Sequence, residues 1–119
     1  MSVTITIPME PPSGNHYKTY RVIGRHVSWY LTKEAKAWHQ AVALACAAVD
    51  QVPGKSHEIT YTVYQGSGSR GDVDNYAKVV LDALVRASVL RSDATVVDLH
   101  AHKRRDRANP RTEIRVRGL

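Results

Sequence analysis

The chain changes from a glycine-rich segment to a helix-forming segment within residues 70–78, whose sequence is RGDVDNYAK. Two acids alternate there, Asp72 and Asp74, and Lys78 follows the second acid by four positions. Side chains two positions apart on an extended segment point to the same side, so both carboxylates can face one point. If Asp74 caps the helix, Lys78 projects over the same helix end. This stretch is therefore the first candidate for a functional site.

Carboxylate oxygens are the ligands that Mg²⁺ prefers, and the ion commonly takes one or two of them while keeping waters and binding substrate phosphate. A nearby ammonium group can neutralise a phosphate oxygen. The pattern thus favours metal-dependent cleavage of a phosphodiester. The alternative is structural: the acids cap a helix, and Lys78 forms an exposed ion pair with Asp82.

Length and composition limit the class of protein. The chain has 119 residues, of which 43% are hydrophobic and 24% are charged, as expected for one globular domain spanning 1–119. No apolar run approaches the roughly 20 residues that cross a bilayer, and the first residues lack a signal-peptide pattern. The single cysteine, Cys46, excludes an internal disulfide. We expect a cytoplasmic protein without a membrane span.

The net charge favours a polyanionic partner. The formal charge is +6, and basic side chains attract nucleic-acid phosphates whatever the base sequence. Seven of these basic residues lie within the last 17 positions: Lys103, Arg104, Arg105, Arg107, Arg111, Arg115 and Arg117. Such clustering indicates a nucleic-acid contact zone, although some of these side chains can also solvate a strand face.

Hydrophobic periodicity predicts an α+β fold. Alternating apolar residues predict strands at 3–7, 57–65, 95–102 and near the C-terminus, and spacings of three and four predict helices at 32–49 and 74–87. Residues 21–29 form a short hairpin or an ordered loop. Thr32 is the expected cap of the first helix, and Trp38 lies on its apolar stripe. The expected architecture is one small domain with a mixed sheet of four to five strands packed against two main helices.

A third acid, Asp93, stands just before a predicted strand and about 20 residues after the first pair. A helix and a tight turn separate it from Asp72. The sequence alone does not place the two acids together, and a turn residue is the simpler interpretation of Asp93.

The order of several short motifs resembles the RusA family of Holliday-junction resolvases. These motifs are D-x-D-N at 72–75, the lysine at 78, D-A-L at 82–84, S-D-A-T-V-V-D at 92–98, and P-P-S-G-N at 11–15. Each is common by itself, but their order and spacing together are specific. The resemblance covers nearly the whole chain.

This resemblance implies a homodimeric, Mg²⁺-dependent endonuclease that cuts paired strands at four-way DNA junctions, with Mn²⁺ as an alternative ion. It implies metal binding and catalysis by Asp72, Asp74 and Asp93, with Lys78 as the catalytic lysine. The chain departs from the family at Ser92, where relatives often carry an aspartate. The residues expected to contact nucleic acid are Arg70, Asn15, Lys103, Arg104, Arg105 and Arg107.

Other functions remain open at this point. One alternative is a catalytically inactive nucleic-acid-binding module, which needs no Mg²⁺ and leaves DNA intact. Another is a metal-dependent nuclease that acts on flaps, ends or other branched DNA. A glycosyltransferase with a D-x-D motif is disfavoured, because the chain is short for a nucleotide-sugar domain and the basic C-terminal segment would have no role.

Overall fold

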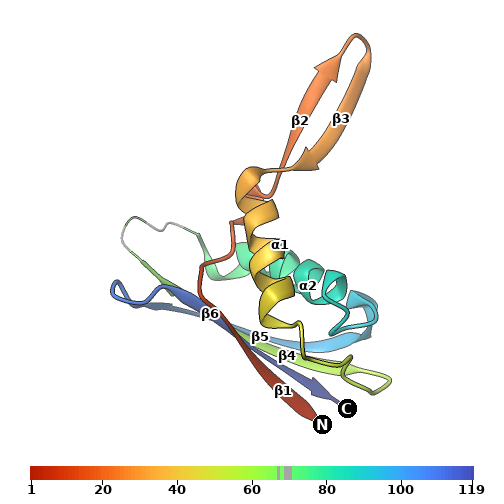
Figure 1. Ribbon diagram of the computed structural model, residues 1–119, viewed down its shortest axis with the longest axis vertical. Coiled ribbons are helices and arrows are strands. Elements are labelled where there is room, and N and C mark those ends of the chain that lie inside the picture. Colours follow the sequence, from red (N-terminus) through yellow and green to blue (C-terminus); the bar gives the residue numbers. More distant parts are fainter. Residues whose placement is uncertain (67, 69–70) are drawn as a thin grey trace.

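A computed structural model describes residues 1–66, 68 and 71–119 of the chain. Its centre is a four-stranded sheet in the order β1-β6-β4-β5, and a separate two-stranded hairpin projects from the body (Figure 1). The strands of the main sheet are β1 (Ser2–Ile7), β4 (His57–Gln65), β5 (Val96–Arg105) and β6 (Arg111–Gly118). The hairpin consists of β2 (Lys18–Ile23) and β3 (His26–Leu31).

The main sheet is mixed. β6 pairs antiparallel with both β1 and β4, whereas β4 pairs parallel with β5. Parallel neighbours need a crossover connection, and here helix α2 (Ala77–Arg86) supplies it. The carboxyl ends of β4 and β5 therefore lie at one end of the sheet, and their amino ends lie at the other.

The first helix, α1 (Lys33–Ala45), begins where the sequence predicts. The Thr32 side chain caps it by accepting a hydrogen bond from the Ala35 N–H at 3.2 Å. Trp38 is fully buried, and its indole N–H donates to the Val79 carbonyl of α2. The helix ends earlier than the apolar stripe suggested, because the chain turns after Ala45 and the stripe continues as a packed loop.

Both helices pack on one face of the sheet (Figure 1). The strand residues that point to the helices form the core, as on β4, where Ile59, Tyr61 and Val63 are fully buried. The opposite face is polar, and its exposed positions include Arg115 and Arg117 of β6. Burying one apolar sheet face under two helices is the standard arrangement of an α+β domain.

The predicted α+β fold is confirmed, with four strands in the main sheet and the segment at 21–29 inside a true hairpin. One strand differs from its pattern: Val97 is 60% exposed and Leu99 is 41% exposed, although both were expected to face the core. β5 is an edge strand with a register shift at its start. Within the described residues, no helix has the length and apolar content needed to cross a membrane.

Candidate functional site

The acidic motif lies just beyond the carboxyl end of β4, on a short 3-10 turn, η2 (Val73–Tyr76), that leads directly into α2. Buried polar side chains of β4 hold this turn. The Tyr61 hydroxyl donates to the Val73 carbonyl at 2.5 Å. The Gln65 amide donates to the Gly71 carbonyl at 2.8 Å and to the Tyr76 hydroxyl at 2.9 Å. The backbone around the two acids is therefore fixed from beneath.

Gly71 is required by close packing. A Cβ atom at this position would lie 2.1 Å from the Tyr76 hydroxyl oxygen, well inside van der Waals contact. The absent side chain lets the Tyr76 ring fold under the chain just before Asp72. The glycine of the motif thus sets the distance between the acidic turn and the core.

Asp72 and Asp74 are both exposed. Asp72 occupies the cap position of η2, yet its carboxylate makes no capping hydrogen bond in the described part of the chain. Asp74 lies inside the turn, so the expectation that it caps the helix is replaced by this arrangement. Neither carboxylate is committed to helix capping, which leaves both available to a ligand.

The pKa values of two buried tyrosines reflect the negative charge nearby. Burial, together with the charges of Asp74 and Tyr76, raises the pKa of Tyr61 to about 12. Burial also raises the pKa of Tyr76; the hydrogen bond from Gln65 opposes this, whereas the charges of Glu10 and Asp72 add to it. Both acids therefore act electrostatically on the core beneath the turn.

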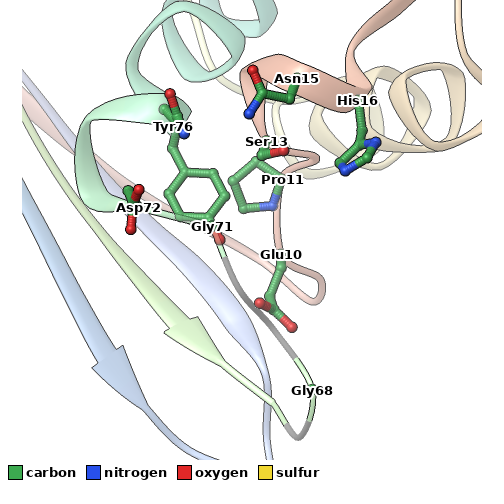
Figure 2. Close-up of a pocket in the computed structure, with 10 residues that line it drawn as sticks. Glu10, Pro11, Ser13, Asn15, His16, Gly68, Gly71, Asp72 and Tyr76 are labelled. Atoms are coloured by element: carbon green, nitrogen blue, oxygen red, sulfur yellow. The ribbon is translucent and has the colours of Figure 1, made fainter.

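A cleft of about 580 Å³ opens beside the acidic turn. Its wall combines the N-terminal loop with the turn, and Figure 2 shows the Tyr76 ring, Pro11 and Asp72 in this region. The lining residues are Glu10, Pro11, Ser13, Asn15, His16, Gly68, Gly71, Asp72, Asn75 and Tyr76. The structure therefore brings Asn15 to the same cleft as Asp72.

Basic residues of β5 border the same region. The Lys103 ammonium donates to the Gly71 carbonyl at 3.4 Å, and the Arg105 guanidinium donates to the Gly66 carbonyl at 3.0 Å. Arg104 and Arg107 are exposed, the first at the end of β5 and the second in the turn to β6. Arg70, the remaining predicted basic contact, lies outside the described residues.

Lys78 is exposed in the first turn of α2, four residues after Asp74. Its expected partner Asp82 has other contacts: the Tyr17 hydroxyl donates to the Asp82 carboxylate, and Arg86 lies 3.5 Å from it. Burial raises the pKa of Asp82, but the Tyr17 hydrogen bond and the positive charges of Arg86 and Lys78 hold it below its usual value. Asp82 therefore joins the N-terminal loop to α2, and Lys78 remains on the surface.

Asp93 lies at the other end of the parallel pair. It begins a short turn, η3 (Asp93–Thr95), just before β5, and Thr95 contacts His57 at the start of β4 with an Oγ1–Nδ1 distance of 2.9 Å. β4 is nine residues long, and a rise of roughly 3.3 Å per residue separates its ends by about 26 Å. Figure 1 shows the acidic turn and the start of β5 at opposite ends of the sheet. One copy of the chain thus brings Asp72 and Asp74 together but not Asp93.

Among the described residues, no group of three His, Cys, Asp or Glu side chains is placed to hold a metal ion. The pair Asp72 and Asp74 matches the smaller requirement of Mg²⁺ for one or two carboxylates. The sequence reasoning missed Glu10, Gln65 and Tyr76. The polar Gln65 at the end of an apolar strand was the available signal, since a buried amide needs partners.

The acidic turn, the cleft and the basic end of β5 lie next to one another. The chain matches the family described as endodeoxyribonuclease RusA over residues 8–117, and it belongs to that family. A comparison with curated proteins gives no match. The RusA resemblance is therefore confirmed, and membership makes the protein an endodeoxyribonuclease that resolves Holliday junctions in DNA recombination. Enzymes of this class generally require a divalent metal.

Proposed function

We propose that the protein is a Mg²⁺-dependent, homodimeric, cytoplasmic resolvase that cleaves paired strands of four-way DNA junctions through Asp72, Asp74, Asp93 and Lys78. The observation that carries this proposal is the exposed acid pair on a rigid turn, beside a cleft and a basic strand end, in a chain of the RusA family. Each residue role below follows from the chemistry of these positions.

Asp72 and Asp74 fit the hard oxygen-donor set of Mg²⁺, and their exposure leaves room for waters and a phosphate. A bound divalent ion supplies charge stabilisation at the phosphate and lowers the pKa of a coordinated water. The turn contributes fixed geometry, because Tyr61 and Gln65 hold its backbone from beneath. A preorganised site avoids the cost of ordering its groups during the reaction.

Lys78 supplies a positive charge on the same side of the site. It follows Asp74 by one helical turn and is solvent-exposed, so its ammonium can reach a phosphate held near the acids. The ammonium would stabilise negative charge that develops on the phosphate during strand cleavage. Asn75 would orient the turn rather than bind metal directly.

In a dimer, the second copy of the chain would supply Asp93 to this site. Asp93 is exposed and lies beyond the amino end of β4, whereas Tyr61 and Gln65 hold the acidic turn over the carboxyl half of that strand. It therefore cannot join Asp72 within one copy without breaking the β4–β5 pairing. A two-fold dimer repeats each surface patch and can place Asp93 of one copy against Asp72 of the other. Two such composite sites would match the paired strands of a junction.

The basic residues beside the cleft would hold the DNA backbone. Lys103 and Arg105 already contact the chain that leads to Asp72, and Arg104 and Arg107 extend the positive surface. Asn15 faces the cleft from the N-terminal loop. Arg70 is proposed as a further contact on the strength of its position before the acid pair.

The deciding experiment measures cleavage of a synthetic four-way junction by wild type and by Asp72→Asn, with Mg²⁺ titrated from zero and Mn²⁺ in parallel. Asp50→Asn is the matched control, because Asp50 is an exposed aspartate that follows α1 and belongs to none of the motifs above. We expect cleavage by wild type and the control only. Duplex and flap substrates of the same sequence test junction selectivity. Metal-independent binding without cleavage would instead identify an inactive binding module.

Mixing two inactive variants tests the composite site. Asp74→Asn and Asp93→Asn proteins are mixed so that subunits exchange. If Asp93 acts across the dimer, each mixed dimer regains one intact site, and nicking of a single strand returns. If both acids acted within one copy, every site in the mixed dimers would remain damaged and no cleavage would return.

A further inference from the structure

The β2–β3 hairpin is a separate element that projects from the body (Figure 1). Its strands pair over all six positions, and Gly24 makes the connecting turn with a φ of +61°. A lone two-stranded hairpin is marginally stable in water and normally packs on something. A projecting hairpin with a regular register is therefore a candidate contact element.

The register gives the hairpin two unlike faces. One face pairs Tyr20 with Trp29 and Val22 with Val27. These side chains are 57%, 66%, 57% and 55% exposed, respectively, and the two rings lie 5.3 Å apart. We call this the aromatic face. It presents two neighbouring rings to solvent, where a body residue such as Trp38 is fully buried.

The charge of the hairpin region favours a negatively charged partner. Residues 11–33 contain no Asp or Glu, and they contain Lys18, Arg21, Arg25 and Lys33. On the other face, the Arg21 guanidinium lies over the Tyr30 ring, 5.7 Å from its centroid. An apolar face alone would equally suit a second protein. A purely cationic element with exposed rings is instead complementary to a polyanion that carries flat bases.

The hairpin also starts at the cleft. The turn η1 (Gly14–His16) precedes β2 almost directly, and Asn15 and His16 line the cleft beside Asp72. A strand of nucleic acid with its phosphate at the acidic turn would therefore continue toward the base of the hairpin. The contact element and the proposed cleavage site lie on one path.

We propose that the hairpin is a nucleic-acid-binding arm whose aromatic face stacks on unpaired or end-exposed bases of branched DNA, while Arg21 and Arg25 contact phosphates. Stacking on tyrosine and tryptophan needs no particular base, because every base has a flat face. Base pairs at a branch point have a neighbour on one side only, which leaves a surface for the rings. The arm rests on the branched-DNA substrate of the proposed function and adds the means of recognising the branch.

Tryptophan fluorescence of the full chain tests the arm. The chain has two tryptophans, Trp29 on the arm and the buried Trp38 as an internal reference. A synthetic four-way junction in EDTA should quench the Trp29 emission and protect it from acrylamide, whereas a linear duplex of the same sequence should do so less. Trp29→Ala should weaken junction affinity about tenfold or more, and Trp29→Phe should restore most of the affinity.

Ile23→Thr is the matched control, because it removes exposed apolar surface from the other face of the hairpin but keeps a strand-forming residue and both rings. Its junction affinity should stay within about twofold of wild type, as expected when stacking carries the contact. If Trp29→Ala bound the junction as tightly as wild type does, the proposal that the hairpin is a DNA-binding arm would be overturned. Sedimentation showing that Trp29→Ala converts a dimer to monomer, while Ile23→Thr does not, would overturn it too, since a second copy would then cover the aromatic face. Failure of the wild-type protein to cleave junctions would instead contradict the proposed function, whatever the fluorescence shows.

Discussion

The two ends of the parallel β4–β5 pair differ in how their polar groups are used. At the carboxyl end, Asp72 and Asp74 are exposed beside a cleft, and Lys103 and Arg105 lie against the chain that leads to them. At the amino end, His57 is 2% exposed. Its Nε2 donates to the Val52 carbonyl at 2.9 Å, and its Nδ1 lies 2.9 Å from the Thr95 hydroxyl oxygen, while the Thr95 hydroxyl donates to the Ser92 carbonyl at 2.8 Å.

The comparison suggests that polar groups at the carboxyl end of this strand pair serve the reaction, whereas the buried polar groups at the amino end stabilise the fold. Proteins with parallel strands commonly bind their ligands just beyond the carboxyl ends of those strands, where the loops leave the sheet. At the amino end, the buried His57 and Thr95 side chains contact each other and nearby carbonyls, so they stabilise the fold, and only the exposed Asp93 beside them is proposed to reach a site, that of a second copy. Substitutions in the acidic turn should change cleavage, and substitutions of the buried His57–Thr95 pair should change stability.

The largest expected effect is on cleavage by Asp74→Asn. Losing a metal-binding carboxylate should lower the junction cleavage rate by about 10³-fold or more, corresponding to roughly 4 kcal/mol of transition-state stabilisation. Junction binding in EDTA should persist, and the free energy of unfolding of the metal-free protein should not fall, because one of two neighbouring negative charges is removed. Single-turnover cleavage and urea denaturation measure these outcomes. A loss of folding with cleavage retained in the folded fraction would reverse the assignment.

The opposite end should respond to His57→Leu with a loss of stability. Removing the ring leaves the Val52 carbonyl without the hydrogen bond from Nε2 and removes the contact to the Thr95 hydroxyl, which keeps its bond to Ser92, and an unsatisfied buried group costs about 1–3 kcal/mol. We expect the urea midpoint to fall while the cleavage rate per folded molecule stays unchanged. A large loss of cleavage in a fully folded His57→Leu protein would break the comparison. Thr95→Val is the milder companion variant.

Gly71→Ala should destabilise the acidic turn. The added Cβ would meet the Tyr76 hydroxyl at 2.1 Å, so Tyr76 must move and lose its hydrogen bond from Gln65. Overpacking of this kind costs about 1–3 kcal/mol, and it should lower both the melting temperature and the cleavage rate. Gly71→Ala combined with Tyr76→Phe should recover neither, because the ring Cζ would still lie 2.4 Å from the added Cβ. Full activity in the single variant would show that the turn is not held as described.

Tyr61 should give the carboxyl end a measurable pH dependence. Its pKa is raised to about 12 from the model-compound value of 10.0. A raised folded-state pKa stabilises the fold fully below pH 10.0, and this contribution is lost as the pH rises through about 12. Tyr61→Phe should cost about 1 kcal/mol at neutral pH through the lost bond to Val73, and it should make stability fall less steeply above pH 10, where Tyr76, whose pKa burial also raises, still contributes. An unchanged alkaline profile in the variant would exclude Tyr61 as the source.

The smallest expected effect is that of Lys103→Gln. Its hydrogen bond to Gly71 is long and exposed, at 3.4 Å, so stability should change by less than about 0.5 kcal/mol. If Lys103 contacts a phosphate, the slope of log affinity against log salt should decrease by about 0.9. Lys55→Gln, an exposed lysine at the amino end of β4, should leave that slope unchanged. Equal slopes for the two variants would remove Lys103 from the DNA contact.

Local patterns predicted the elements well, because periodicity records which side of an element is buried. The stripe around Trp38 and the alternation along β4 both matched buried positions. The pattern failed at Val97 and Leu99, which are partly exposed on the edge strand β5. Whether a strand lies at the edge of the sheet depends on the order of the strands, and the local sequence does not determine that order.

The candidate site was predictable only where its parts are neighbours in sequence. Asp72, Asp74 and Lys78 share one turn and the helix that follows it, and the structure keeps them at the carboxyl end of β4. The entry of Glu10 and Asn15 into the same cleft depends on packing between segments about 60 residues apart. Asp93 is separated from the pair because β5 runs parallel to β4, a pairing that the alternation pattern does not distinguish from an antiparallel one.

By itself, the sequence determined the helices and strands, the acid pair, the cationic character of the chain and its family. Side-chain periodicity, charge and motif spacing are properties of neighbouring residues, so they need no knowledge of the fold. The tertiary structure alone decided that Asp93 lies at the far end of the sheet, that the N-terminal loop forms the cleft wall, and that the aromatic face of the hairpin is left exposed. These three features depend on how distant segments pair and pack, which is set by the whole chain at once.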